Sequence, residues 1–225
     1  MGEHIRFSGI GQEAEGYLAK PANGKGVGVI VLQEWWGLVG HITAVCDRFA
    51  KAGFVALAPD LYGGKTTTEP DEAESLMMAL NIAEAERILR GAVERLLADE
   101  ATLGQKVGIV GFCMGGQLSM FAACANPQIG ACVNFYGIHP NVHPDFESLQ
   151  APILGFFADL DPYATPEAVD ALDATLRAAG KSHRFFTFAN THHAFFNSDR
   201  PEVFSEEASE QCWERMLAFF KEHLA

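Results

Sequence analysis

Residues that could carry out nucleophilic catalysis follow three apolar runs of the sequence. They are one cysteine, Cys113, an acidic pair, Asp159 and Asp161, and a histidine pair, His192 and His193. A thiolate can attack a carbonyl carbon, a histidine can carry protons, and an acid can orient the histidine. These residue types predict acyl transfer through a covalent intermediate, provided that the fold brings them together.

The cysteine lies in the stretch GFCMGG (111–116), directly after the apolar run KVGIV (106–110). A nucleophile at the tip of a strand-to-helix turn has strained backbone geometry, and neighbours without side chains let the strand and helix approach. The glycines around Cys113 meet that need. The pattern G-x-C-x-G therefore predicts a nucleophile elbow with sulfur in place of oxygen. On this stretch alone, the alternative of a packed thiol beneath an ordinary turn stays open.

Strand-like and helix-like patterns alternate along the chain. Predicted strands cover 15–20, 26–33, 54–60, 106–112, 129–137, 151–159 and 183–190. Predicted helices cover 41–53, 70–100, 116–125, 165–181 and 201–224. Strands that are apolar on both faces and alternate with helices predict a mostly parallel central sheet with helices on both faces. We therefore expect a three-layer α/β fold that forms a single domain over residues 1–225.

The carboxyl ends of parallel strands are where ligands bind in such sheets. Polar or reactive residues that close the predicted strands are Gln33, Glu34, Asp60, Cys113, Tyr136, Asp159 or Asp161, and His192 with His193. Cysteine, acid and histidine thus emerge on one edge of the sheet, in the chain order used by the α/β-hydrolase architecture.

Composition limits the classes of function. The 225 residues, 48% apolar and 20% charged, fit a globular domain with a substantial core. A net charge of −13 repels phosphate backbones, so we expect no nucleic-acid partner. No apolar run reaches the length of a membrane span, and the N-terminus lacks a signal-peptide pattern. We therefore expect a cytoplasmic protein with no membrane partner.

The five cysteines are odd in number, widely spaced and without a CxxC pair. This usage favours reduced thiols over a disulfide framework or a metal site. Apart from Cys113, they are expected to behave as small core residues.

Nearly the whole sequence resembles the dienelactone hydrolases (carboxymethylenebutenolidases) of the α/β-hydrolase superfamily. The resemblance rests on VLQEWWG (31–37), APDLYGG (58–64), GFCMGG (111–116), GFFADLDPYA (155–164) and HHAFF (192–196). It implies a hydrolase of small carboxylic esters or lactones that requires no metal and no organic cofactor.

The resemblance also implies roles for four side chains. Cys113 is the nucleophile, His193 the general base and Asp161 its orienting acid. Glu34 is the family's additional carboxylate, which contacts the resting thiol and accepts its proton when substrate binds. A free thiol has a pKa of about 8.5 and is little ionised at neutral pH, so such a base has a purpose. The alternative is that Glu34 pairs with a basic group and only braces its loop.

Neighbouring candidates are separated by the family's motif. The base directly precedes Ala-Phe, which selects His193 over His192, and the acid precedes a turn proline, which selects Asp161 over Asp159. We expect Asp159 to hydrogen-bond within its loop and Asp60 to serve the PDLYGG turn.

The backbone N–H groups of Trp35 and Met114 are expected to form the oxyanion hole. Five residues are expected in the substrate pocket: Trp36, Tyr136, Phe195, Phe196 and Asn197. Asn197 stands where the resemblance implies an arginine that grips a substrate carboxylate. Losing that arginine favours neutral substrates, unless a loop folds Arg200 into the pocket.

Two other classes of function remain open from the sequence. A catalytically silent α/β-hydrolase that senses a small molecule would keep the pocket, but it would not need an intact cysteine, acid and histidine. A thiol-redox protein would need a resolving cysteine, and no second cysteine closes a predicted strand. The assembly state is expected to be a monomer or a small homo-oligomer.

Overall fold

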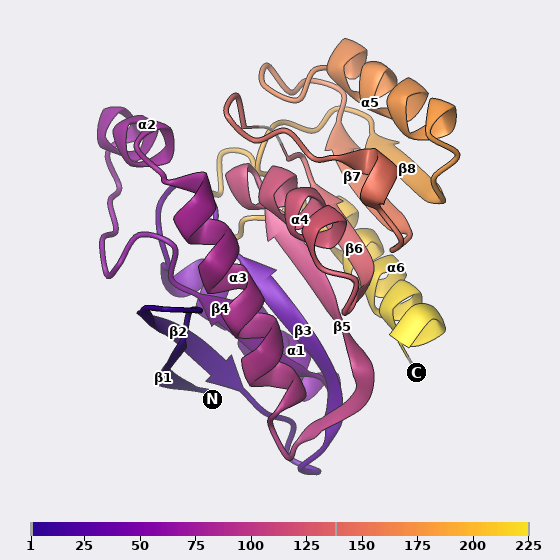
Figure 1. Cartoon of the computed structure of the whole chain (residues 1–225). Coiled ribbons are helices and arrows are strands. Elements are labelled where there is room, and N and C mark those ends of the chain that lie inside the picture. The colour runs from indigo at the N-terminus through magenta and orange to yellow at the C-terminus, as the bar shows by residue number, and fades with distance from the viewer. Residues whose placement is uncertain (1, 138, 225) are drawn as a thin grey trace.

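A single eight-stranded sheet organises the computed structural model, which describes residues 2–137 and 139–224 (Figure 1). The strands are β1 (Glu3–Ser8), β2 (Glu13–Ala19), β3 (Gly26–Leu32), β4 (Val55–Pro59), β5 (Thr102–Phe112), β6 (Ile129–Phe135), β7 (Ile153–Ala158) and β8 (His183–Phe188). The helices are α1 (Gly40–Lys51), α2 (Pro70–Met78), α3 (Ile82–Leu97), α4 (Met114–Ala125), α5 (Pro166–Ala178) and α6 (Glu206–Leu224), with a short 3₁₀ turn at Phe146–Ser148.

The sheet is mixed but mostly parallel, in the order β1-β2-β4-β3-β5-β6-β7-β8. From β4 to β8 every neighbouring pair is parallel, whereas β2 runs antiparallel to both β1 and β4. Continuous β-branched and leucine runs such as Val29–Leu32 are completely buried, as strands covered on both faces must be. The predicted α/β fold with a mostly parallel sheet is confirmed.

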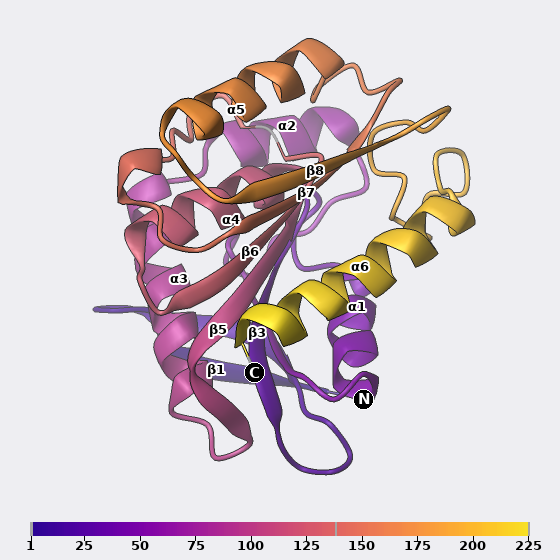
Figure 2. The same cartoon turned by 90° about the vertical axis from the view of Figure 1, so that its right-hand side faces the viewer.

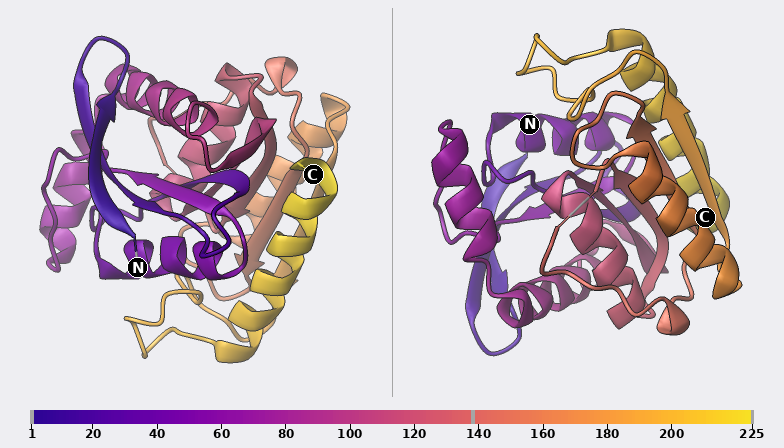
Figure 3. Two further views of the ribbon diagram at one scale, coloured as in Figure 1. Left: turned by 90° about the horizontal axis from the view of Figure 1, so that it is seen from below. Right: turned by 90° about the horizontal axis from the view of Figure 1, so that it is seen from above.

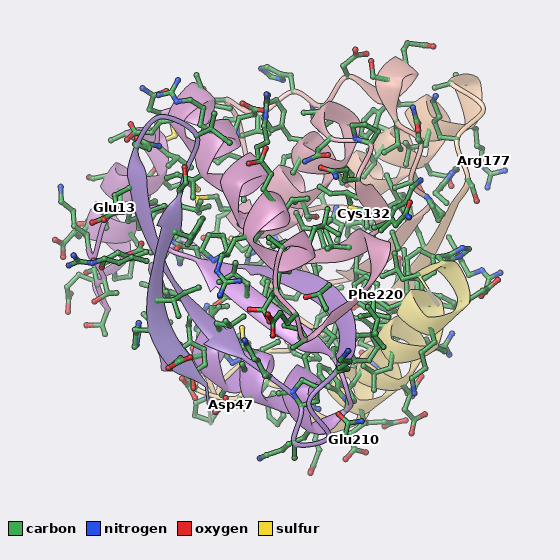
Figure 4. The ribbon with its side chains drawn as sticks, turned by 60° about the horizontal axis from the view of Figure 1, so that its bottom comes forward. Glu13, Asp47, Cys132, Arg177, Glu210 and Phe220 are labelled. Atoms are coloured by element: carbon green, nitrogen blue, oxygen red, sulfur yellow. The ribbon has the colours of Figure 1, made fainter. Side chains whose placement is uncertain are left out.

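Helices cover both faces of this sheet. Figure 2 shows α3 and α4 on one side of the strands and α1 and α6 on the other. Phe49 of α1 and Phe220 of α6 belong to one buried cluster, and Leu89 of α3 and Leu118 of α4 belong to another. Figure 4 labels Phe220, whose helix α6 packs against β6 and β5. None of the helices in the described part of the chain is long and apolar enough to cross a membrane.

The prediction of one helix over 70–100 is wrong, because α2 ends at Met78 and α3 begins at Ile82. Asn81 is extended at this point, and its side chain accepts a hydrogen bond from the N–H of Glu84 at 3.2 Å. This is an N-cap, which starts a new helix. The result is a short α2 that stands off the sheet, with Ala73 as its one buried residue (Figure 3).

Other elements differ at their ends. Strand β1 was not predicted, and it forms the outer strand of an antiparallel hairpin with β2. The last helix begins at Glu206 instead of residue 201, because residues 201–203 form a turn. Helix α4 begins at Met114, two residues earlier than predicted. The last difference matters for the site, because it places Cys113 immediately before the first turn of a helix.

Candidate active site

Cys113 occupies the turn between β5 and α4 with φ 54° and ψ −121°. This conformation is uncommon for a residue with a side chain, and it persists only where the surroundings impose it. Here the N–H of Cys113 donates to the carbonyl oxygen of Phe135 at 3.0 Å, which ties the turn to the neighbouring strand β6. The thiol is partly exposed. The backbone therefore holds Cys113 at the carboxyl edge of the sheet.

The glycines of this turn leave no room for side chains. A methyl group on Gly111 would overlap the carbonyl of Gly115, and one on Gly116 would overlap the side chain of Asn134. A methyl group on Gly115 would lie 2.5 Å from the carbonyl oxygen of Gln33. Strands β3, β5 and β6 and helix α4 thus approach one another at backbone distance around the elbow.

Asp161 and His193 meet at the same edge, from the loops after β7 and β8. The Nδ1 atom of His193 lies 2.7 Å from Oδ2 of Asp161, whose side chain is fully buried. The other oxygen of Asp161 accepts hydrogen bonds from the N–H groups of Tyr163 at 2.8 Å and Ala164 at 3.0 Å. Asp159 instead accepts from the N–H of Thr191 at 3.3 Å, within the adjoining loop.

His193 is poised as a proton carrier. Burial alone would lower its pKa, but charge and hydrogen bonding from Cys113, together with Asp161, outweigh burial and raise the pKa to about 10. The imidazole therefore retains a proton when the sulfur beside it is ionised. His192 is exposed and lines the same cavity as His193, but it is His193 that Asp161 binds.

Glu34 follows β3 and is 1% exposed. Its Oε2 atom accepts a hydrogen bond from Nδ2 of Asn197 at 2.6 Å. Burial raises the pKa of Glu34, and the opposing effects of His193, the Asn197 amide and Arg200 do not cancel that rise. Within the described residues no ion pair joins Glu34 to a basic side chain. The hydrogen-bond partner of Glu34 is the neutral amide of Asn197, and not a basic side chain in an ion pair.

A cavity of about 600 Å³ opens over these groups. Its lining comprises Glu34, Trp35, Trp36, Pro70, Met77, Cys113, Pro140, Pro162, Tyr163, His192, His193, Ala194, Arg200 and Val203. A second cavity of about 580 Å³, between the β1–β2 hairpin and α3, is lined by neither cysteine nor histidine. The first cavity is therefore the candidate active site.

The structure places only Trp36, among the five expected pocket residues, in the lining of this cavity. Tyr136, Phe195, Phe196 and Asn197 are at most 2% exposed and lie beneath it. Tyr136 packs its ring 5.0 Å from the imidazole of His193, and Phe196 stacks 5.3 Å from Phe112 in the core. The physical reason is the local backbone: Ala194, with φ 65°, redirects the chain before Phe195 and Phe196, and Tyr136 has a φ of 40° of its own.

Tyr163 and Arg200 also line the cavity; Tyr163 was not expected there from the sequence, whereas Arg200 had been named as a residue that a loop could bring into the pocket. Tyr163 packs edge-on against His193, with ring centroids 5.0 Å apart, and the only signal was its position two residues after the acid. Arg200 reaches the cavity, where its guanidinium lies 6.0 Å from the ring of Trp36 and its Nε binds Glu202 at 2.9 Å. The expectation of a neutral substrate assumed that no arginine reaches the pocket. Because Arg200 lines the cavity, the main reason for that expectation does not hold.

Of the two expected oxyanion donors, Trp35 lines the cavity and Met114 directly follows Cys113 in the chain. Met114 is the first residue of α4, so its N–H has no acceptor within the helix. The N–H of Trp35 donates to no acceptor among the described residues. Asp60 has the expected structural role, because its carboxylate accepts from the N–H groups of Tyr62 and Gly64 in the turn. Across 2–137 and 139–224, no group of three acidic, histidine or cysteine side chains is arranged to hold a metal ion.

The sequence and fold match a known family. Residues 14–224 match the sequence profile of the Dienelactone hydrolase family. The chain is 36% identical to "Protein usf" of Aquifex pyrophilus and 34% identical to a "Putative carboxymethylenebutenolidase" of Aquifex aeolicus, in both cases over the full length of both proteins. The crystal structure of a "Putative Dienelactone Hydrolase" from Klebsiella pneumoniae superposes with a TM-score of 0.87 at 28% identity, covering 99% of this chain and 100% of that one. The chain with the Cys113 elbow therefore belongs to the dienelactone hydrolase family.

Proposed function

We propose that this protein hydrolyses a carboxylic ester or lactone through a thioester on Cys113. The observation that carries the proposal is the strained turn at Cys113, with φ 54°, opposite a histidine that a buried Asp161 holds at 2.7 Å. An ordinary connection between a strand and a helix has no need of that backbone geometry or of the cavity above it. The arrangement supplies a nucleophile, a proton carrier and an orienting acid.

The protons can be assigned to these groups. We assign His193 a proton because the Asp161 carboxylate stabilises the imidazolium, and the sulfur adds to this effect once it is ionised. The protonated imidazole is suited to protonate the leaving oxygen. Glu34 in its ionised form is a buried base in the same cavity, and its raised pKa makes it a better proton acceptor than an ordinary carboxylate. We assign it the proton that leaves Cys113.

The reaction then runs in two steps. The thiolate adds to the carbonyl carbon, and the N–H groups of Trp35 and Met114 stabilise the oxyanion. Collapse breaks the bond to the leaving oxygen, which takes the proton of His193. In the second step the now neutral His193 accepts a proton from water, hydroxide adds to the thioester, and the sulfur leaves and regains its proton from Glu34. Ester and water become acid and alcohol, and every group returns to its starting state.

The cavity suits a small substrate. Its wall is mainly aromatic and apolar, from the two tryptophans, Met77, Tyr163 and Val203, and its volume of about 600 Å³ is typical of small-molecule sites. Arg200 adds one permanent positive charge beside Trp36. A compact ester or lactone that carries an anionic substituent fits both features.

The test is turnover of p-nitrophenyl acetate before and after alkylation with iodoacetamide, in the native chain and in Cys113→Ala. We expect hydrolysis that alkylation abolishes and that the variant lacks. Cys124→Ala is the matched control, because Cys124 is also partly exposed but lies at the far end of α4. Unchanged turnover in Cys113→Ala would overturn the mechanism, and absence of turnover on a panel of esters and lactones would favour a silent binding protein.

A further inference from the structure

A hydrogen bond deep in the site joins two loops that are far apart in the sequence. Nδ2 of Asn197 donates to Oε2 of Glu34 at 2.6 Å, across 163 positions of the chain. Both side chains are almost completely buried, Glu34 at 1% and Asn197 at 2% exposure. This bond links the loop after β3 to the loop after β8, which carries His193. A buried bond between loops that carry catalytic groups can act on the chemistry as well as on the fold.

The Asn197 amide is held in one orientation. Its Oδ1 accepts a hydrogen bond from the N–H of Asp199 at 3.0 Å, so its NH₂ group is the part that faces Glu34. Its backbone is fixed as well, because its N–H donates to Ala194 at 2.9 Å and its carbonyl accepts from the N–H of Arg200 at 3.1 Å. Asn197 is therefore a rigid hydrogen-bond donor aimed at one carboxyl oxygen.

The other carboxyl oxygen of Glu34 has a different environment. Oε1 is buried and has no hydrogen-bond partner among the described residues. An ionised carboxyl oxygen without a partner is costly in a buried site, so Oε1 gains most from a bound proton. Glu34 lines the same cavity as Cys113, whose thiol has a proton to give in the proposed mechanism.

The charges around Glu34 do not tie it to one protonation state. The ionisable groups that act on it or lie beside it are His193, Arg200, Asp199, Cys113 and Tyr136. Positive and negative groups both occur in this set, and none forms an ion pair with Glu34 within the part of the chain described. A guanidinium in place of the Asn197 amide would hold the carboxyl permanently ionised. A neutral donor leaves it able to exchange a proton.

We propose that Asn197 is a positioning residue, which holds Glu34 by Oε2 with a neutral amide so that Oε1 stays free to take the proton of the Cys113 thiol. The inference rests on the proposed function, because it concerns the activation of the same nucleophile. The step breaks the S–H bond of Cys113 and forms an O–H bond on Glu34, while the negative charge passes from oxygen to sulfur. When Glu34 is already protonated, it cannot accept this proton, so thiol reactivity falls on the acid side.

The test measures thiol reactivity without ester turnover. Cys113 is alkylated with iodoacetamide over a range of pH, and its modification is followed by mass spectrometry of the Cys113 peptide. In Asn197→Leu, which has a similar volume but donates no hydrogen bond, the ionised form of Glu34 loses its donor and the pKa of Glu34 rises. We expect the acid limb of the alkylation profile to move to higher pH by about one unit, with reactivity at neutral pH lowered by about tenfold.

The matched control repeats the substitution in a Glu34→Gln background. If Asn197 acts through Glu34, Asn197→Leu has no further effect on the pH profile there, so the two substitutions are strongly non-additive. Thermal unfolding checks that each variant is folded, and Asn197→Ala, which creates no overpacking and donates no hydrogen bond from its side chain, replaces the leucine variant if that one does not fold. The proposal would be overturned if a folded variant had the acid limb of its alkylation profile at the same pH as the native chain. It would also be overturned if Asn197→Leu still shifted the acid limb in the Glu34→Gln background.

The outcome is separable from that of the proposed function. Alkylation reports on the thiol whether or not an ester is hydrolysed. A shifted acid limb in a protein that hydrolyses no ester would leave this inference standing and remove the proposed activity. Normal ester hydrolysis with an unshifted acid limb in Asn197→Leu would leave the proposed activity standing and remove this inference.

Discussion

Asp161 holds His193 by a hydrogen bond that Nδ1 of the imidazole donates to Oδ2 of the carboxylate at 2.7 Å, although the two residues belong to loops after different strands. The carboxylate is itself fixed, because its second oxygen accepts the N–H groups of Tyr163 and Ala164. An acid held in this way fixes the imidazole plane and leaves Nε2 as the nitrogen for proton transfer. Backbone N–H groups therefore fix Asp161, and Asp161 in turn fixes the orientation of His193.

This relationship predicts different results for the two adjacent histidines. His193→Ala removes the proton carrier, so kcat should fall by roughly a thousandfold or more. His192→Ala removes an exposed side chain at the cavity rim and should lower kcat by at most about tenfold. The measurement is steady-state hydrolysis of one ester by both variants. A larger loss in His192→Ala would show that the wrong neighbour had been assigned.

The elbow glycines predict a loss of stability. In Gly111→Ala the new methyl group would meet the backbone of Gly115, which cannot move without separating β5 from α4. Overpacking of this kind costs about 1–3 kcal/mol, and more where backbone must shift. Gly40→Ala is the matched control, because nothing lies within 4 Å of a methyl group at the start of α1. Urea unfolding of both variants is the measurement, and equal midpoints would contradict the close approach.

The strand ends could be predicted from the sequence because buried parallel strands have a clear signature. Each continuous apolar run ends abruptly at a polar residue, and parallel strands present such ends at one edge. Cys113 and His193 were located in this way, and a family motif chose between neighbours. The interruption between α2 and α3 was missed because apolar residues continue through it at helical spacing. Asn81, an asparagine of the type favoured at helix N-caps, was the signal in the sequence that could have indicated it.

The cavity wall could not be predicted because it depends on the paths of loops. Phe195 and Phe196 follow the histidine and looked like pocket residues, but the left-handed backbone of Ala194 turns them into the core. Arg200 returns to the cavity through the turn that follows Asn197. Neither path has a periodic pattern, because loop backbones satisfy their hydrogen bonds by local contacts that hydrophobic spacing does not record.

A buried histidine outside the site predicts a dependence of stability on pH. His41 of α1 is 4% exposed between Phe112 and Phe196, and burial lowers its pKa to about 4. An unfolded histidine has a pKa of about 6.5, so between these values the unfolded chain binds a proton that the folded chain does not. The stability is therefore complete above about pH 6.5 and is lost as the pH falls toward 4. The expected loss from this residue is about 3 kcal/mol.

The test compares urea unfolding at both ends of that pH range in the native chain and in His41→Phe. The phenylalanine keeps an aromatic ring against its two neighbours but cannot be protonated. We expect the variant to lose less stability on acidification, by about the amount assigned to His41. Parallel loss in the two proteins would mean that other groups, such as the paired carboxylates, account for the acid sensitivity.

The position of Arg200 predicts a preference for charge in the substrate. Its guanidinium lies beside Trp36 in the cavity wall, and among the described residues its one side-chain partner is the exposed Glu202, which binds Nε. A substrate carboxylate can bind the remaining N–H groups, and a charge-assisted bond of this kind is worth about tenfold in affinity. In Arg200→Gln, kcat/KM for a carboxylated lactone should fall by about tenfold, with a smaller change for an uncharged ester of similar size. Arg177→Gln is the control, because Arg177 lies at the surface on α5 (Figure 4). The native chain could instead prefer the uncharged ester, and Arg200→Gln could leave the ratio of the two kcat/KM values unaltered. That result would show that the arginine stabilises its loop and that the site selects neutral substrates.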